Sequence, residues 1–174
     1  EMDDSKEHMF SAKFACPNPL YHAYSNDIVL DNSGNPIIAG IVFNSGTLED
    51  FLLIKYTGTG STHWFRINNR TCNFDEFITA SKMDNSGNYY TSGVIEQSVS
   101  LAGNPIGFGV VEKINSSGAL VWSYIDSTLN GNDRYDISYN DIAVDNAGNV
   151  YITGTANSKC ITTKFNSAGN LLWS

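Results

Sequence analysis

Short runs of apolar and β-branched residues alternate along the chain with clusters of asparagine, glycine and serine. Typical runs are "DIAV" (141–144) and "VYITG" (150–154), which lie on either side of the polar cluster "DNAGN". Runs of this length that are rich in Ile, Val, Tyr, Phe and Thr favour β-strands. No stretch of comparable length has apolar residues at helical spacing. The pattern therefore predicts an all-β protein.

The strands and turns recur as a repeat. "DNSGN" occupies residues 31–35 and 84–88, and "DNAGN" occupies residues 145–149. Each copy lies between two apolar runs and is followed further on by a lysine, a glycine and a tryptophan at constant spacing: Lys55, Gly60 and Trp64; Lys113, Gly118 and Trp122; Lys164, Gly169 and Trp173. Each unit is long enough for four short strands.

The repeated pentapeptide has two interpretations, a turn or a cation site. In a turn, the aspartate accepts hydrogen bonds from amides two residues on, and glycine supplies the positive φ that closes a hairpin with a bulge. "NSSG" (115–118) and "NSAG" (166–169) predict the same turn with asparagine as the acceptor. Calcium usually takes more carboxylates than one aspartate per loop supplies. The turn is favoured, and calcium is kept as the alternative; no other cofactor is expected.

A four-stranded unit repeated at least three times predicts a β-propeller with four-stranded antiparallel blades. The segments "DIAVDNAGNVYITG" and "TTKFNSAGNLLWS" resemble the bacterial SBBP β-propeller repeats, and more distantly NHL repeats. The resemblance covers about residues 9–174; Pro36, Lys82 and Thr57 with Gly58 depart from the pattern. It implies a secreted or cell-surface propeller without enzymatic activity, and the family offers no catalytic motif to transfer.

About three and a half blades are expected. The predicted parts are a polar segment (1–8), a degenerate half blade (9–26) with Lys13 and His22 at the Lys and Trp positions, and three blades at 27–75, 76–138 and 139–174. The tryptophans are expected to pack where blades meet. Since a propeller usually has four or more blades, we expect either a longer chain or other copies that complete a ring or a filament.

Composition narrows the possible partners. The net charge of −8 and the pI near 4.6 argue against nucleic acid and anionic lipid, and no apolar run is long enough to span a membrane. Three cysteines, Cys16, Cys72 and Cys160, match no zinc spacing and cannot all pair within one chain. Buried or free thiols are favoured, with one disulfide as the alternative.

No metal or catalytic pattern occurs among His8, His22 and His63, and no G-x-S-x-G motif is present. The variable loops should share one rim of the propeller, opposite the DNxGN turns, and should carry any recognition of a protein or glycan. The candidate binding residues on this rim are Phe43, Asp50, Phe74, Asp75, Arg134, Tyr135 and Asp136. Asn69 is a possible glycosylation site.

A lyase or hydrolase with a site on this rim, in the manner of propeller lyases such as streptogramin lyase, is the alternative to a non-enzymatic module.

Overall fold

The computed structural model describes residues 22–43, 49–68, 75–97, 106–126 and 137–174, which form twelve strands. The first six are β1 (His22–Leu30), β2 (Pro36–Phe43), β3 (Glu49–Tyr56), β4 (Thr62–Asn68), β5 (Asp75–Met83) and β6 (Tyr89–Gln97). The others are β7 (Ile106–Ile114), β8 (Leu120–Asp126), β9 (Ile137–Val144), β10 (Val150–Ala156), β11 (Lys159–Phe165) and β12 (Leu171–Trp173). The described residues contain no helix, and hence none able to cross a membrane.

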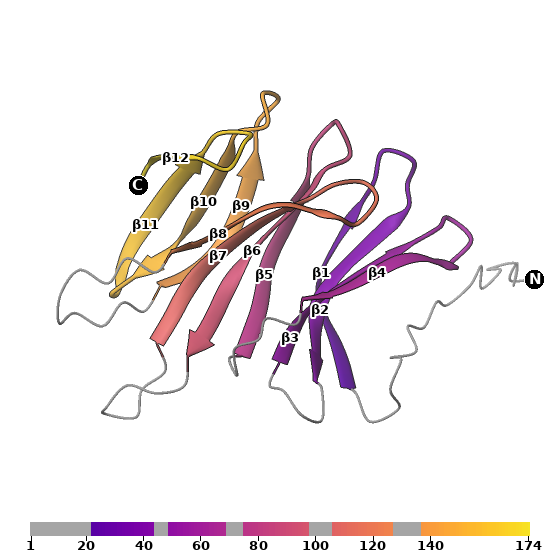
Figure 1. Cartoon of the computed structure of the whole chain (residues 1–174), viewed down its shortest axis with the longest axis horizontal. Coiled ribbons are helices and arrows are strands. Elements are labelled where there is room, and N and C mark those ends of the chain that lie inside the picture. Colours follow the sequence, from indigo (N-terminus) through magenta and orange to yellow (C-terminus); the bar gives the residue numbers. More distant parts are fainter. Residues whose placement is uncertain (1–21, 44–48, 69–74, 98–105, 127–136) are drawn as a thin grey trace, which may run out of the picture.

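The strands form three four-stranded sheets in which every strand pairs antiparallel with its neighbour in sequence. Sheet 1 contains β1–β4, sheet 2 contains β5–β8 and sheet 3 contains β9–β12, and they stand side by side in this order (Figure 1). The first strand of each following sheet contacts three strands of the sheet before it: β5 lies against β1, β2 and β3, and β9 against β5, β6 and β7. The predicted all-β class with four-stranded antiparallel units is confirmed. The described sheets do not close into a ring.

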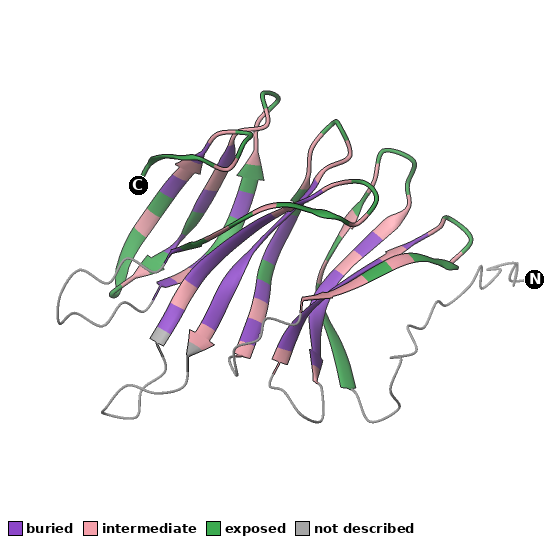
Figure 2. Cartoon of the chain, in the orientation of Figure 1, coloured by how far each residue is buried: buried purple, intermediate pink, exposed green. Residues whose placement is uncertain are grey.

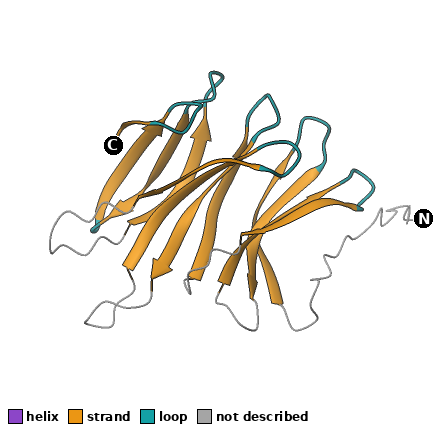
Figure 3. Ribbon diagram, viewed as in Figure 1, coloured by secondary structure: helices purple, strands orange, loops and turns teal. Residues whose placement is uncertain are grey.

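The repeated pentapeptide forms the predicted turn. Asp31 Oδ1 accepts hydrogen bonds from the amides of Ser33, at 2.9 Å, and Asn35, at 2.8 Å. The Gly34 amide donates to the Asp31 carbonyl, and Gly34 has a φ of 79°. The turns that begin at Asp84, Asp145, Asn115 and Asn166 repeat these bonds. All these turns lie along one edge of the sheets (Figure 3).

A bulge in the first strand of each sheet explains the glycine that ends the second apolar run of every repeat. In sheet 2 the register shifts between Ile78 and Ala80, so the carbonyl of Phe77 presses against Gly93. A Cβ on Gly93 would lie 2.0 Å from that carbonyl oxygen. The other sheets have the same bulge, opposite Gly40 and Gly154. The bulge turns one residue out of the strand pairing, here Thr79.

The core lies between the sheets. One apolar cluster joins sheets 1 and 2 and includes Ile37, Phe51, Ile78, Ile95 and Val110. A second cluster joins sheets 2 and 3 and includes Tyr90, Val111, Tyr139, Ile152 and Phe165. Strands between two such clusters are buried along most of their length (Figure 2). Each sheet therefore gains its stability from its neighbours as well as from its own pairing.

The sheet boundaries differ in detail from the predicted blade boundaries. β1 begins at His22, so residues 22–26 extend the first strand of sheet 1 instead of ending a separate half blade. Sheets 2 and 3 begin at Asp75 and Ile137, slightly earlier than the predicted residues 76 and 139. Residues 1–21, which contain most of the predicted half blade, lie outside the described residues.

Candidate functional site

The tryptophans of the fourth strands lie at the junctions between sheets. Trp64 Nε1 donates a hydrogen bond to the Ser116 carbonyl in sheet 2, at 3.2 Å, and its ring covers Gly118. A Cβ on Gly118 would lie 2.9 Å from the Trp64 ring, so only glycine fits there. The junction between sheets 2 and 3 repeats the arrangement with Trp122, Ser167 and Gly169. The predicted role of the tryptophans at blade contacts is confirmed at these two positions.

The bulged residues also bridge the sheets. Asn26 Nδ2 donates to the Ile78 carbonyl at 3.0 Å. Thr79, at the same repeat position in sheet 2, donates through Oγ1 to the Tyr139 carbonyl in sheet 3. Ile78 and Tyr139 are themselves at equivalent positions, so one bond pattern is used twice.

A third link joins neighbouring DNxGN turns. Asn32 Nδ2 donates to the Asn85 carbonyl at 3.0 Å, and Asn85 Nδ2 donates to Asn146 Oδ1 at 3.4 Å. These asparagines hold the same position in the three turns. The two junctions are therefore copies of one interface, in which each sheet reaches toward the next one along the chain.

Sheet 3 presents the same set of groups with no following sheet among the described residues. Its outer face, formed by Tyr151, Thr153, Cys160, Thr162 and Trp173, is exposed apart from the partly buried Tyr151. The equivalent residues of sheet 2 are Tyr90, Ser92, Gly109, Val111 and Trp122, and all but the tryptophan are buried. Figure 2 shows the exposed residues along β11 and the end of the chain. This outer face of sheet 3 is the candidate site.

The chemistry of this face suits a protein surface. A shallow hollow of about 120 Å³ is lined by Asp141, Tyr151, Thr153 and Thr162, with parts of β9 and β10. Lys164 Nζ lies 4.8 Å from the centre of the Tyr151 ring, a cation–π contact at the edge of the face. Hydroxyls, methyl groups and aromatic rings can pack against another strand and form a small number of hydrogen bonds with it.

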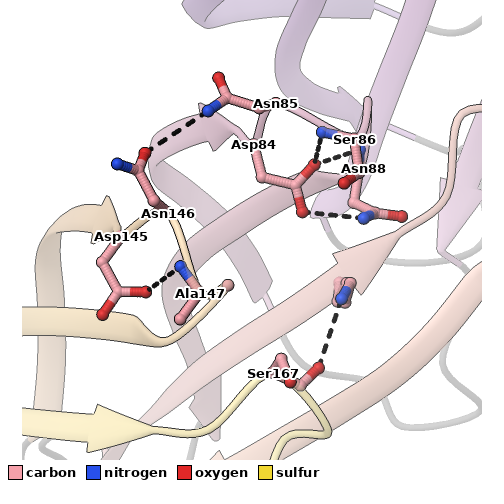
Figure 4. A pocket seen from close by; sticks show the side chains of 10 residues that line it. Asp84, Asn85, Ser86, Asn88, Asp145, Asn146, Ala147 and Ser167 are labelled. Atoms are coloured by element: carbon pink, nitrogen blue, oxygen red, sulfur yellow. Dashed lines mark hydrogen bonds between the residues drawn. The ribbon is translucent and has the colours of Figure 1, made fainter.

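A second, polar pocket of about 180 Å³ lies on the turn edge between sheets 2 and 3 (Figure 4). Its walls are the turns that contain Asp84, Asn85, Asp145 and Asn146, and Lys113 Nζ donates to the Ser167 carbonyl at 3.3 Å across it. The aspartate oxygens are occupied by the donors of their own turns. Among the described residues, no three His, Cys, Asp or Glu side chains group as metal ligands would.

The turn aspartates are held as carboxylates. Burial would raise the pKa of Asp31, but hydrogen bonds from Lys55, Asn35 and the Ser33 amide lower it far below its ordinary value. Lys55 Nζ lies 2.8 Å from Asp31 Oδ2.

In sheet 2 a tyrosine takes the place of this ion pair. The Tyr90 hydroxyl donates to Asp84 Oδ2 at 3.0 Å, where the equivalent residue of sheet 1 is Ile37. Desolvation again opposes the shift, and bonds from Asn88, Tyr90 and the Ser86 amide lower the pKa of Asp84. The lysine of sheet 2 is then free to reach the next turn.

The structure places three of the predicted rim residues at the edge of the sheets opposite the DNxGN turns. Phe43 ends β2, Asp50 is buried in β3 and Asp75 begins β5. The Glu49 amide donates to Asp75 Oδ1 at 3.1 Å, and Phe43 packs edge-on against Tyr24 with 6.0 Å between ring centres. The other predicted residues, Phe74, Arg134, Tyr135, Asp136 and the glycosylation candidate Asn69, lie outside the described residues, as do Cys16 and Cys72.

Sequence reasoning missed Glu49 on this rim and the whole outer face of sheet 3. Desolvation, together with Asp75 and Glu96, raises the pKa of Glu49. Only the spatial meeting of three strands reveals this group of carboxylates. The outer face could have been found by asking which repeat positions of the last unit have no following copy to cover them.

Comparison with known proteins agrees with the repeat architecture. Residues 127–159 match the model of the SBBP β-propeller repeat family, and this segment includes β9 and β10. No curated protein matches the chain. The matched segment contains the DNAGN turn and the strands on both sides of it, which are the parts that the other two sheets repeat most closely. The segment of residues 127–159 is therefore similar to an SBBP β-propeller repeat.

Proposed function

We propose that this chain is a non-enzymatic, secreted or cell-surface β-propeller segment that acts as a structural interaction module. It binds by blade completion, in which a further β-sheet unit covers the outer face of sheet 3. The observation that carries the proposal is the pair of equivalent junctions, whose contacting groups have counterparts on sheet 3 that no described residue of another sheet covers. An acidic chain with this surface is suited to protein contacts more than to nucleic acid or membrane.

The size of the exposed area supports a protein partner. Trp173 is 49% exposed, and Thr153 and Thr162 are exposed beside the partly buried Tyr151 on β10 and β11. When another sheet excludes water from the apolar parts of these side chains, the burial stabilises the assembly. The equivalents of Tyr151, Thr153 and Thr162 in sheets 1 and 2 are buried by such a neighbour.

The carboxylates on the variable-loop rim, the place expected for an enzyme site, also support a non-enzymatic role. Asp75 accepts a hydrogen bond from the backbone, and Asp50 is 4% exposed. A general acid or base has to reach the substrate proton, which a buried carboxylate such as that of Asp50 does poorly.

The test is the reactivity of Cys160 in the native protein isolated from its source. Cys160 is a free, exposed thiol on the outer face of sheet 3, and its equivalent in sheet 2 is the buried Gly109. Blade completion predicts that a maleimide modifies Cys160 in the native protein at least about tenfold more slowly than in the urea-unfolded chain. Peptide mapping distinguishes it from the other cysteines. Equal rates would show an uncovered face and would overturn the proposal.

Location is tested separately with a membrane-impermeant biotin reagent on intact cells and on the culture medium. A secreted or cell-surface module is labelled on the cells or recovered from the medium. Recovery of the protein solely after cell lysis would contradict this part of the proposal.

A further inference from the structure

We propose that the partner of the sheet 3 outer face is strand β1 of a second copy of this chain. The inference rests on the proposed role in blade completion and names the unit that completes the blade. It follows from a comparison of equivalent positions in the three first strands, β1, β5 and β9.

The first strand of a following sheet is the part that enters the junction. In β5 the residues that face sheet 1 are Glu76, Ile78 and Ser81, and all three are buried. In β9 the equivalent residues are Ile137, Tyr139 and Ile142, which are also buried, against sheet 2. Tyr139 and Ile137 cover Gly109, where an added Cβ would lie 2.6 Å from the tyrosine ring.

Strand β1 has the same three positions, and among the described residues no sheet lies against them. They are Ala23, Ser25 and Ile28, and all are exposed, Ile28 by 58%. Tyr24 and Leu30, at 57% and 61% exposed, extend this open strand. One end of the chain thus presents an inserting strand, and the other end presents the surface into which such strands insert.

The two surfaces can meet without a steric clash. At the junction of sheets 2 and 3, the large Tyr139 side chain lies over Gly109. At the proposed junction, the small Ser25 and Ala23 would lie over Cys160, which holds the position of that glycine. Cys160 is larger than that glycine and the side chains above it are smaller, so the larger residue at this position meets no steric clash.

The hydrogen-bond donors fit as well. Asn140 and Asn146 hold the positions of the bridging residues Asn26 and Asn32, and within the described residues their Nδ2 groups have no partner. In a second copy, the Ser25 carbonyl is the equivalent of the acceptor at both existing junctions, and the Asn32 carbonyl is the equivalent of the acceptor at the junction of sheets 1 and 2.

A second copy is required because sheets 1 and 3 lie at opposite ends of the row, with sheet 2 between them (Figure 1). A chain cannot place its own β1 on its own sheet 3. A head-to-tail contact between two copies forms one junction, and a reciprocal pair would contain six sheets, within the range of about four to eight blades found in propellers.

The experiment uses the 174-residue chain and two face variants, with particle mass from sedimentation over a range of concentrations. Ile28→Glu places a charge on the β1 surface, and Thr162→Arg places one on the outer face of sheet 3. We expect the wild type to self-associate, and each variant alone to need at least about tenfold higher concentration. Because each variant keeps one intact surface, an equimolar mixture should give 1:1 pairs. Circular dichroism melting checks that each variant is folded.

Leu172→Arg is the matched control. Leu172 is 51% exposed, and its equivalents His63 and Val121 stay exposed even where a following sheet is present. This variant should associate like the wild type.

The outcomes separate this inference from the proposed function. A folded wild-type chain that stays monomeric at all concentrations, or a mixture that forms no pairs, overturns the second-copy partner. If Cys160 is nevertheless protected in the native protein, blade completion stands with a different unit. If Cys160 is unprotected in the native protein, the proposed function itself fails.

Discussion

The indole Nε1 of Trp122 donates a hydrogen bond to the carbonyl oxygen of Ser167, 3.2 Å away in the neighbouring sheet. The contact depends on Gly169, because a Cβ at that residue would lie 2.6 Å from the indole ring. A tryptophan in one repeat and a glycine in the next therefore form a single packing unit. This pairing explains why both residues recur at constant spacing.

Removal of a junction tryptophan should destabilise the fold. We expect Trp122→Ala to lower the free energy of unfolding by about 2 kcal/mol, since the half-buried indole loses its packing and its hydrogen bond. Urea unfolding followed by circular dichroism measures the change. Trp173→Ala, in a residue 49% exposed, should cost less than about 0.5 kcal/mol at concentrations where the chain is monomeric. Equal losses in the two variants would contradict the role of the junction.

The glycine opposite each bulge is sterically required. Gly93→Ala would place a Cβ 2.0 Å from the Phe77 carbonyl oxygen, so the strand pairing has to shift. We expect a loss of about 3 kcal/mol in the free energy of unfolding. Gly58→Ala is the control, because a Cβ on Gly58 would lie 3.6 Å from Asn35 Oδ1, which is an ordinary van der Waals distance. A Gly93→Ala protein as stable as the wild type would show that the bulge is dispensable.

Acid should destabilise the protein through the turn aspartates. The pKa values of Asp31, Asp84 and Asp145 are lower in the folded state than in the unfolded chain, where an aspartate has a pKa of about 3.9. A lowered folded-state pKa contributes stability that is fully present above the unfolded value. The free energy of unfolding should therefore decline as the pH falls below about 5 and continue to decline through about 3. Urea titrations at each pH measure this.

Lys55→Met isolates the contribution of one turn. Loss of the ion pair at 2.8 Å raises the folded-state pKa of Asp31 toward its ordinary value, so the variant should be less stable than the wild type at pH 7. The difference between the two proteins should shrink in acid, where Asp31 is protonated in both. Lys164→Met, at the equivalent residue of sheet 3, removes a contact with the Tyr151 ring and should show no such pH dependence. A difference that stays constant with pH would contradict the ion-pair assignment.

Calcium should leave the melting temperature unchanged. In the DNxGN turns, both oxygens of Asp84 and of Asp145 already accept hydrogen bonds from their own turn and from Tyr90 or Tyr151. A cation would have to displace these donors. Melting curves with CaCl₂ or with EDTA test the turn interpretation directly, with calcium at about 5 mM, above the dissociation constants of about 10⁻⁴–10⁻³ M of weak calcium sites. A rise in melting temperature with calcium would favour the cation site instead.

Local sequence signals were enough to predict the strands, the turns and the packing role of the tryptophans. The turn follows from neighbouring residues, since Asp31 bonds to the amides of Ser33 and Asn35. The bulge cannot be predicted from neighbouring residues, because the carbonyl that lies against Gly93 belongs to Phe77, in another strand. Its only trace in the sequence is the recurring glycine, which can also end a strand.

Differences between the repeats were harder to predict than their common features. Lys55 forms an ion pair with Asp31, whereas Lys113 lies over the Tyr90 ring and reaches the Ser167 carbonyl. The change follows from one position, which is Ile37 in sheet 1 and Tyr90 in sheet 2. The Tyr90 hydroxyl donates a hydrogen bond to Asp84 Oδ2, the equivalent of the oxygen that Lys55 contacts in sheet 1. Only the arrangement of three side chains around one carboxylate explains why identical lysines have different partners.

The row of equivalent junctions has a consequence for local unfolding. Sheet 2 is held on both faces, while sheet 3 is held by sheet 2 alone among the described residues, and its last strand has three residues. In an array coupled through nearest neighbours, the free energy of opening is lowest at an end with one neighbour. Amide hydrogens of β11 and β12 should then exchange with deuterium faster than those of β6 and β7. A unit bound to the outer face of sheet 3 would slow this exchange and make the end of the row as resistant to opening as its middle.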